Sequence, residues 1–170
     1  GAAAGPAGLG YYSFDLGAWH VVSLNSNIDA QPGSPQYEWA RRDLASSAGL
    51  CSLALWHHPV FNSGAYGNNP HMKQVWRLLD AAGVDLVATG HEHSYQRYAP
   101  QDADGRPDAR GMRQFVVGTG GAERLPLTAV QPNSEARSSD AWGVLKLVLR
   151  SSSYEWEFIP AQGQSFRDQG

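Results

Sequence analysis

Gly83-Val-Asp-Leu-Val-Ala-Thr-Gly90-His91-Glu92-His93 contains an apolar run, 84–89, followed by a glycine and by two histidines two positions apart. The run is short and apolar, which predicts a buried strand. In extended backbone, residues i and i+2 point to the same side, with Cα atoms about 6.5 Å apart. Because neutral imidazole is the commonest metal ligand among side chains, the pattern indicates metal chemistry at a strand end, with Glu92 pointing away.

A second predicted strand, 52–56, also ends in histidine, at His57-His58-Pro59. In open α/β sheets the functional crevice lies beyond the carboxyl ends of the strands, so we expect both histidine groups at one edge. Pro59 favours extended backbone at His58, which predicts that His57 and His58 face opposite ways. We expect His57 to face the crevice. A single histidine after a strand is usually structural, but two such groups favour a shared metal site.

The rest of the chain predicts a mixed α/β fold. Alternation of strands and helices in the first half implies parallel crossovers, and the closing strands indicate an antiparallel hairpin. Ser34 and Pro35 are typical of the N-cap and first position of a helix. The small, uncharged residues 1–10 predict a flexible linker or loop, with one domain over 11–170. The expected strands are 11–16, 19–24, 52–56, 84–89, 115–117, 142–149 and 154–159, and the expected helices are 35–45 and 69–82.

Composition is typical of a soluble globular domain. Of the 170 residues, 42% are hydrophobic and 17% are charged, and the net charge of −3 gives no reason to require nucleic acid or an anionic membrane as partner. The single cysteine, Cys51, excludes an internal disulfide. No apolar run approaches the ~20 residues of a membrane span.

Three segments, 56–64, 83–97 and 114–121, resemble the calcineurin-like metallophosphoesterase family, and within it the bacterial enzymes that are similar to purple acid phosphatases. The combination of Gly-His-x-His with a His-x-Pro about thirty residues upstream carries the resemblance. It implies the carboxyl-terminal half of a four-layer α/β/β/α sandwich, with a mixed sheet and closing antiparallel strands. It also implies a dinuclear metal centre that hydrolyses phosphate esters.

The resemblance implies particular ligands. His57 and His91 would bind one ion and His93 the other, the ions being Fe, Zn or Mn. In the purple acid phosphatases a histidine of the loop after His-x-Pro helps to protonate the leaving group. Here Tyr66 stands near that position, and His71, the only histidine of the loop, is a candidate without an assigned role.

The family also needs an Asp-x-His, a Gly-Asp and a Gly-Asn-His-Asp/Glu, and none of them occurs in these residues. We therefore expect a fragment with about half of a catalytic site, inactive alone and at most partly occupied by metal, which needs a missing amino-terminal half. One alternative is a non-catalytic domain that binds a single metal or a partner, and another is a structural unit without metal. The location in or outside the cell is open, although the resemblance suggests export.

Overall fold

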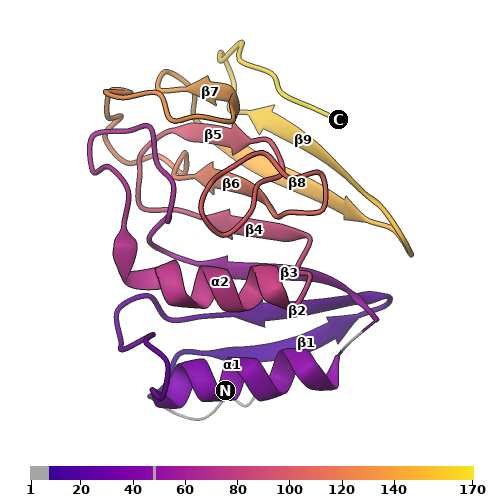
Figure 1. The fold of residues 1–170 in the computed structure, drawn as a ribbon. Coiled ribbons are helices and arrows are strands. Elements are labelled where there is room, and N and C mark those ends of the chain that lie inside the picture. The colour runs from indigo at the N-terminus through magenta and orange to yellow at the C-terminus, as the bar shows by residue number, and fades with distance from the viewer. Residues whose placement is uncertain (1–7, 48) are drawn as a thin grey trace.

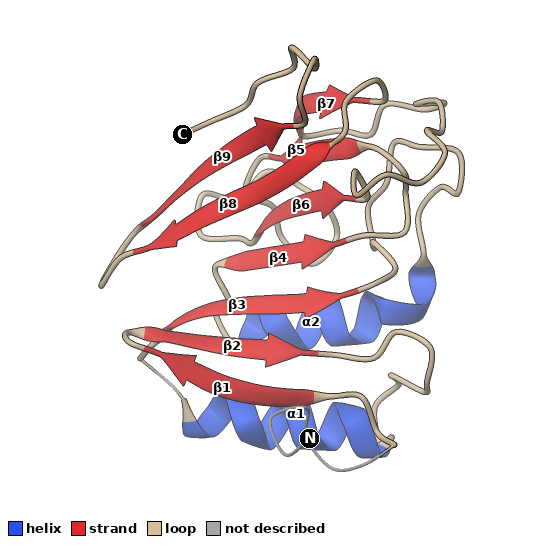
Figure 2. Cartoon of the chain, turned by 180° about the vertical axis from the view of Figure 1, so that it is seen from behind, coloured by secondary structure: helices blue, strands red, loops and turns tan. Residues whose placement is uncertain are grey.

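The computed structural model describes residues 8–47 and 49–170. Most of the expected linker therefore lies outside the described residues. Two helices cover one face of a seven-stranded sheet, and a two-stranded sheet lies on the other face (Figures 1 and 2). The large sheet has the order β1-β2-β3-β4-β6-β5-β7, and β8 pairs with β9. The strands are β1 Tyr12–Leu16, β2 Trp19–Ser23, β3 Cys51–Trp56, β4 Leu86–Thr89, β5 Tyr95–Tyr98, β6 Arg113–Val117, β7 Ser134–Ser138, β8 Gly143–Leu149 and β9 Tyr154–Pro160.

The centre of the large sheet is parallel. Strands β2, β3, β4 and β6 run in one direction, whereas β1, β5 and β7 are joined in antiparallel fashion at the two sides. Strand β3 lies directly beside β4, with Trp56 opposite Thr89 at their carboxyl ends. This register brings the loops that follow the two strands to the same edge, as expected from the parallel crossovers.

The first helix begins where the sequence predicts, whereas the α-helical part of the second begins at Lys73 and not at the expected residue 69. Helix α1, Pro35–Ser46, has Ser34 as its N-cap, whose hydroxyl accepts a hydrogen bond from the backbone N–H of Tyr37 at 3.3 Å. A single 3-10 turn, η2 at Pro70–Met72, leads into α2, Lys73–Ala81. No helix within residues 8–47 and 49–170 has the length and apolar character needed to cross a bilayer.

Two hydrophobic cores hold the layers together. One lies between the helices and the large sheet and contains the fully buried Met72, Trp76 and Leu79. The other lies between the two sheets and contains Phe115 and Phe158. These layers correspond to three of the four layers of the expected sandwich, and the mixed sheet and the closing antiparallel pair are confirmed.

Strands β5 and β7 were not expected from the sequence. Tyr95-Gln-Arg-Tyr98 is short and interrupted by polar residues, although Gln96 is fully buried. The β7 residues, Ser-Glu-Ala-Arg-Ser, carry no apolar pattern and join the sheet through pairing with β5. Strand β4 also begins at Leu86, two residues later than expected, because the backbone N–H of Val84 bonds back to Leu79 at the end of α2.

Candidate metal centre

The loops after β3 and β4 meet directly. The backbone N–H of Gly90 donates to the carbonyl of His57 at 3.0 Å, which extends the strand pairing by one further bond. His57 and His58 leave β3 at this point, while His91, Glu92 and His93 follow β4. The expectation that the two histidine groups share one edge is therefore confirmed.

The backbone at His91 is not extended. His91 has a φ of 64°, in the left-handed region that non-glycine residues rarely adopt. Two tight bonds follow, from the N–H of Glu92 to Gly90 (2.8 Å) and from the N–H of Ser94 to the carbonyl of Glu92 (2.7 Å). The chain here forms a compact turn, which we call the histidine turn, residues 90–94. The expectation of an extended His-x-His is wrong, although the side chain of Glu92 points away from the two histidines as predicted and is bonded to Asn62 and Tyr66.

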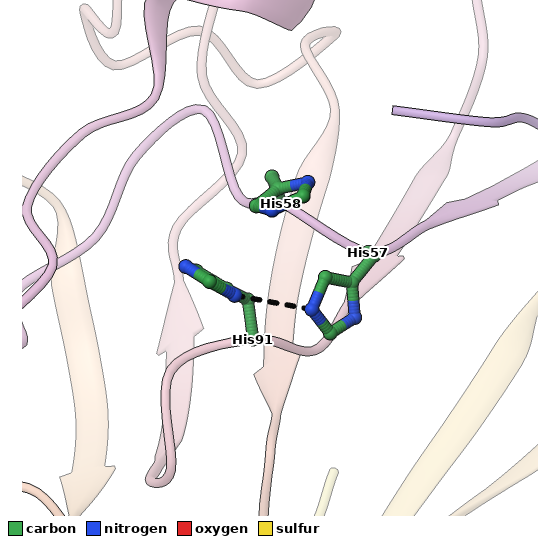
Figure 3. Close-up of side chains that lie close together, drawn as sticks. All are labelled: His57, His58 and His91. Atoms are coloured by element: carbon green, nitrogen blue, oxygen red, sulfur yellow. Dashed lines mark hydrogen bonds between the residues drawn. The ribbon is translucent and has the colours of Figure 1, made fainter. Parts of the chain in front are cut away.

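Three imidazole rings converge on one place. Each of His57, His58 and His91 has a possible ligand atom within 4.8 Å of those of the other two. Nε2 of His57 lies 3.0 Å from Nδ1 of His91, and the ring centroids of His58 and His91 are 4.3 Å apart (Figure 3). We call these residues the histidine cluster.

His58 belongs to this cluster, which corrects the expectation that His57 and His58 face opposite ways. Their ring centroids lie 4.7 Å apart at an interplanar angle of 87°. Nδ1 of His58 lies 2.8 Å from the hydroxyl of Ser26, which also accepts the backbone N–H of His58 at 3.1 Å. Ser26 lies in the loop after β2, so a third strand end fixes the orientation of this ring.

His93 lines the same pocket as His57 and His91 but stands outside the cluster. Its Nδ1–H donates to the backbone carbonyl of Glu123 at 2.5 Å. Such a bond leaves Nε2 with a free lone pair and fixes the ring, as in many metal-binding histidines. The pocket has a volume of about 370 Å³, and the other lining residues are Tyr66, Gly90, Val117, Gly118, Gly120 and Ala122.

The donor set fits a metal ion. Burial lowers the pKa of His91, and the neighbouring imidazole of His57 lowers it further. Burial also lowers the pKa of His58, and the neighbouring imidazoles of His91 and His57 lower it further. The rings of His58 and His91 therefore favour the neutral form that binds metal. Two nitrogen ligands about 2.1 Å from one tetrahedral ion lie about 3.4 Å apart. Nε2 of His57 and Nδ1 of His91 are hydrogen-bonded at 3.0 Å, so these two rings would have to move apart slightly to receive an ion between them.

The cluster holds no carboxylate among the described residues. Glu92, the nearest in sequence, turns its side chain away and is fully buried. Three neutral imidazoles suit a single ion, but they offer no negative charge to offset two ions held close together.

His71, the candidate from the loop after His-x-Pro, lies elsewhere. Its Nε2–H donates to the carbonyl of Ile28 at 2.7 Å, and its own carbonyl accepts from Gln31 at 3.2 Å. These bonds tie η2 to the segment after β2, and His71 is not among the residues that line the pocket.

Tyr66 and Ser26 are the site residues that the sequence did not assign. The ring of Tyr66 lies over His91, with centroids 4.5 Å apart and planes tilted by 31°. The only sequence signal for Tyr66 is its place in the loop after His-x-Pro, and Ser26 has none beyond following a strand.

Comparison with known proteins gives a consistent picture. Residues 6–95 match the family model described as calcineurin-like phosphoesterase. Purple acid phosphatase 18 of Arabidopsis thaliana is 35% identical over 121 residues, which are 65% of this chain and 26% of that protein. Probable purple acid phosphatase 20 of the same plant is 31% identical over 160 residues, 87% of this chain and 37% of that protein.

A solved structure is also similar. The purple acid phosphatase PPD1 from yellow lupin (Lupinus luteus) seeds superimposes with a TM-score of 0.83 and 22% identity, covering 95% of this chain and 32% of that one. This chain therefore spans about a quarter to somewhat over a third of the length of these relatives. At that identity, the lupin structure establishes similarity of fold alone.

Proposed function

The chain belongs to the calcineurin-like phosphoesterase family, and from this premise we propose that it is part of a metal-dependent enzyme that hydrolyses phosphate esters. The observation that carries the proposal is the convergence of three imidazoles, from the ends of two neighbouring parallel strands, to within 4.8 Å of one another. Convergent imidazoles in the neutral form are suitable ligands for a transition-metal ion.

In this proposal His57 and His91 hold one ion and His93 holds a second, the ions being drawn from Fe, Zn and Mn. When bound, such ions act as Lewis acids on the phosphoryl group and supply hydroxide at neutral pH. The protein's own part is orientation. The carbonyl of Glu123 fixes the ring of His93, and the turn at His91 aims its Nδ1 at His57.

We further propose that a segment outside residues 11–170 supplies the carboxylates, so that these residues form one part of a larger domain and are inactive alone. The all-imidazole donor set supports this, because two ions held together need negative charge between them. A groove of about 490 Å³ supports it as well. The groove is largely apolar, lies between β8 and the face of the large sheet, and shares Gly90, Val117 and Gly120 with the histidine pocket.

Within residues 8–47 and 49–170, strand β8 pairs on one side only, with β9, and Val144 on it is 59% exposed. A strand with one unpaired edge beside an apolar groove is suited to the addition of further strands. Export from the cell, suggested by the family resemblance, belongs to the same proposal.

A second function follows from the donor set itself. A single ion held by the histidine cluster, without catalysis, would make this chain a metal-binding or interaction domain derived from the same fold. The absence of any carboxylate from the cluster within the described residues favours it.

Metal content and turnover separate these functions. We expect the full-length protein to contain two ions and to hydrolyse p-nitrophenyl phosphate, and both properties to be lost with His91→Ala. His71→Ala is the matched control, since His71 bonds to a backbone carbonyl outside the pocket, and it should retain both. One ion without turnover would favour the binding domain. Full activity of His91→Ala would contradict the assignment of His91 to the metal site. Robust turnover by residues 1–170 alone would contradict the proposal that the site is incomplete.

A further inference from the structure

Glu92 separates two histidines in sequence, yet its side chain serves a different part of the molecule. It is fully buried, and its Oε2 accepts hydrogen bonds from Nδ2 of Asn62 at 2.7 Å and from the backbone N–H of Tyr66 at 3.0 Å. Its Oε1 has no hydrogen-bond partner among the described residues. Because burying a carboxylate is costly unless it is hydrogen-bonded, these two bonds are the compensation that keeps Glu92 inside.

The loop above Glu92 is shaped to receive it. A Cβ atom added to Gly64 would lie 2.0 Å from Cδ of Glu92, so a side chain at that position would occupy the space of the carboxylate. Oδ1 of Asn62 accepts from the backbone N–H of Gly64 and from Nε2 of Gln96 on β5, both at 2.8 Å. The segment 62–66, which we call the anchored loop, is thereby joined to β5 and to the histidine turn at once.

The anchored loop ends at Tyr66, whose ring stands at the site. Tyr66 is 55% exposed and lines the pocket together with His57, His91 and His93. Its ring centroid is 4.5 Å from that of His91 and 6.4 Å from that of His93. The bond to Glu92 comes from the backbone N–H of Tyr66, so it leaves the hydroxyl of this exposed side chain unengaged. A phenol O–H that is available as a donor therefore stands beside the imidazoles.

We propose that Tyr66 is a substrate-contacting residue whose hydroxyl donates a hydrogen bond to a phosphoryl oxygen, and that Glu92 is the positioning residue that holds Tyr66 over His91. The inference rests on the proposed function, since it needs a phosphate ester in this pocket. A hydrogen bond to an anionic oxygen is about twice as strong as one between neutral groups. Accurate placement of Tyr66 by Glu92 would therefore strengthen substrate binding. Glu92 itself is no ligand, because its bonded oxygen faces the anchored loop.

Tyr66→Phe tests the contact, in the full-length protein with p-nitrophenyl phosphate as substrate. Removing a hydrogen bond to a charged group should lower kcat/KM by roughly 10- to 100-fold. Competitive inhibition by inorganic phosphate should weaken by a similar factor, while metal content stays unchanged. Because Tyr66 is largely exposed, the variant should fold normally. Unchanged kinetics and phosphate inhibition in Tyr66→Phe would overturn the contact.

Glu92→Gln and Glu92→Ala test the positioning. Both bonds end on the single atom Oε2, so an amide oxygen can accept both, and Glu92→Gln should keep wild-type kinetics. Glu92→Ala should lose as much activity as Tyr66→Ala, and the double variant should lose no more than either one. Losses that multiply in the double variant would overturn the positioning role. If Glu92→Ala fails to fold, Glu92→Leu, which fills the space without an acceptor, replaces it.

His91→Ala separates this inference from the proposed function. If His91→Ala abolishes metal binding and turnover while Tyr66→Phe and Glu92→Ala behave as wild type, this inference fails and the proposed function stands. If His91→Ala keeps both metal binding and turnover, the proposed function and this inference fail together.

Discussion

The carboxylate of Asp168 receives two hydrogen bonds from the guanidinium group of Arg97, from Nε at 2.7 Å and from Nη2 at 2.9 Å. Its Oδ2 also accepts from the hydroxyl of Tyr95 at 2.7 Å and from the indole of Trp156 at 3.0 Å. Tyr95 and Arg97 lie on β5, directly after the histidine turn. The last segment of the chain is therefore fastened to the strand that leaves the site.

Asp168→Ala should destabilise the protein strongly. The side chains of Asp168 and Arg97 are only 10% and 13% exposed, so the substitution leaves a buried cation with Glu135 as its remaining acidic partner and removes the acceptor of Tyr95 and Trp156, at a cost of about 3 kcal/mol. Urea unfolding measures this change. Asp104→Ala is the control, since its ion pair with Arg77 is about half exposed and should contribute less than about 1 kcal/mol. Equal effects of the two substitutions would contradict the role of Asp168.

Stability should fall with rising pH because of His20. His20 is 5% exposed, with Nδ1 2.7 Å from Asp15 and Nε2 2.9 Å from Asp43, which also accepts from Ser13. Burial alone would lower the pKa of His20, but the hydrogen bonds to Asp15 and Asp43 outweigh it and raise the pKa. A raised pKa gives stability that is complete below the ordinary value of about 6.5 and is lost as pH rises through the folded value.

The comparison of wild type with His20→Gln tests this dependence. We expect the free energy of unfolding of the wild type to fall as the pH rises from about 6.5 through the raised folded-state pKa of His20, and His20→Gln to lack most of that fall. A parallel pH profile for the two proteins would show that other groups are responsible.

Gly118→Ala should disturb the histidine turn. A Cβ atom at Gly118 would lie 1.9 Å from the carbonyl oxygen of Glu92, so the turn must shift, at a cost of about 1–3 kcal/mol. Metal affinity should fall with it, because the rings of His91 and His93 move. Gly120→Ala is a close control in the same pocket, since a Cβ there meets nothing within 4 Å. Calorimetric titration with Zn²⁺ compares the two, and equal affinities would refute the prediction.

Metal should stabilise the fold through the histidine cluster. An ion that binds only the folded state at a hundredfold excess over its Kd adds about 2.7 kcal/mol to stability. Addition of Zn²⁺ should therefore raise the melting temperature of the wild type and of His71→Ala, and EDTA should reverse the rise. His57→Ala should respond much less. A rise of the same size in His57→Ala would remove this histidine from the ligand set.

Strong local patterns predicted much of this fold. The apolar runs of β3 and β4, the capped helix α1 and the closing hairpin all occur close to where the sequence placed them. Strands β5 and β7 escaped prediction because their pairing depends on neighbours distant in sequence. Gln96, for example, is buried at no great cost only because Asn62, Ser94 and Ser63 bond to it.

The sequence predicted which loops meet at the site, but it did not predict how the imidazole rings are oriented there. Parallel pairing was enough to bring His57 and His91 together. The inward orientation of His58 depends on Ser26, a residue from another loop, and overrides the local preference set by Pro59. The left-handed backbone of His91 has no signature in the sequence, because the tertiary structure around it imposes that conformation.

The left-handed backbone at position 91 favours glycine, whereas the proposed metal site needs a histidine there. A glycine would adopt a φ of 64° without strain, whereas a histidine there costs the fold roughly 1–2 kcal/mol. Selection for thermal stability alone would favour glycine at position 91. Only a requirement for the imidazole would keep histidine there. At this position of the histidine turn, a substitution that stabilises the fold is therefore expected to remove a residue that the metal chemistry needs.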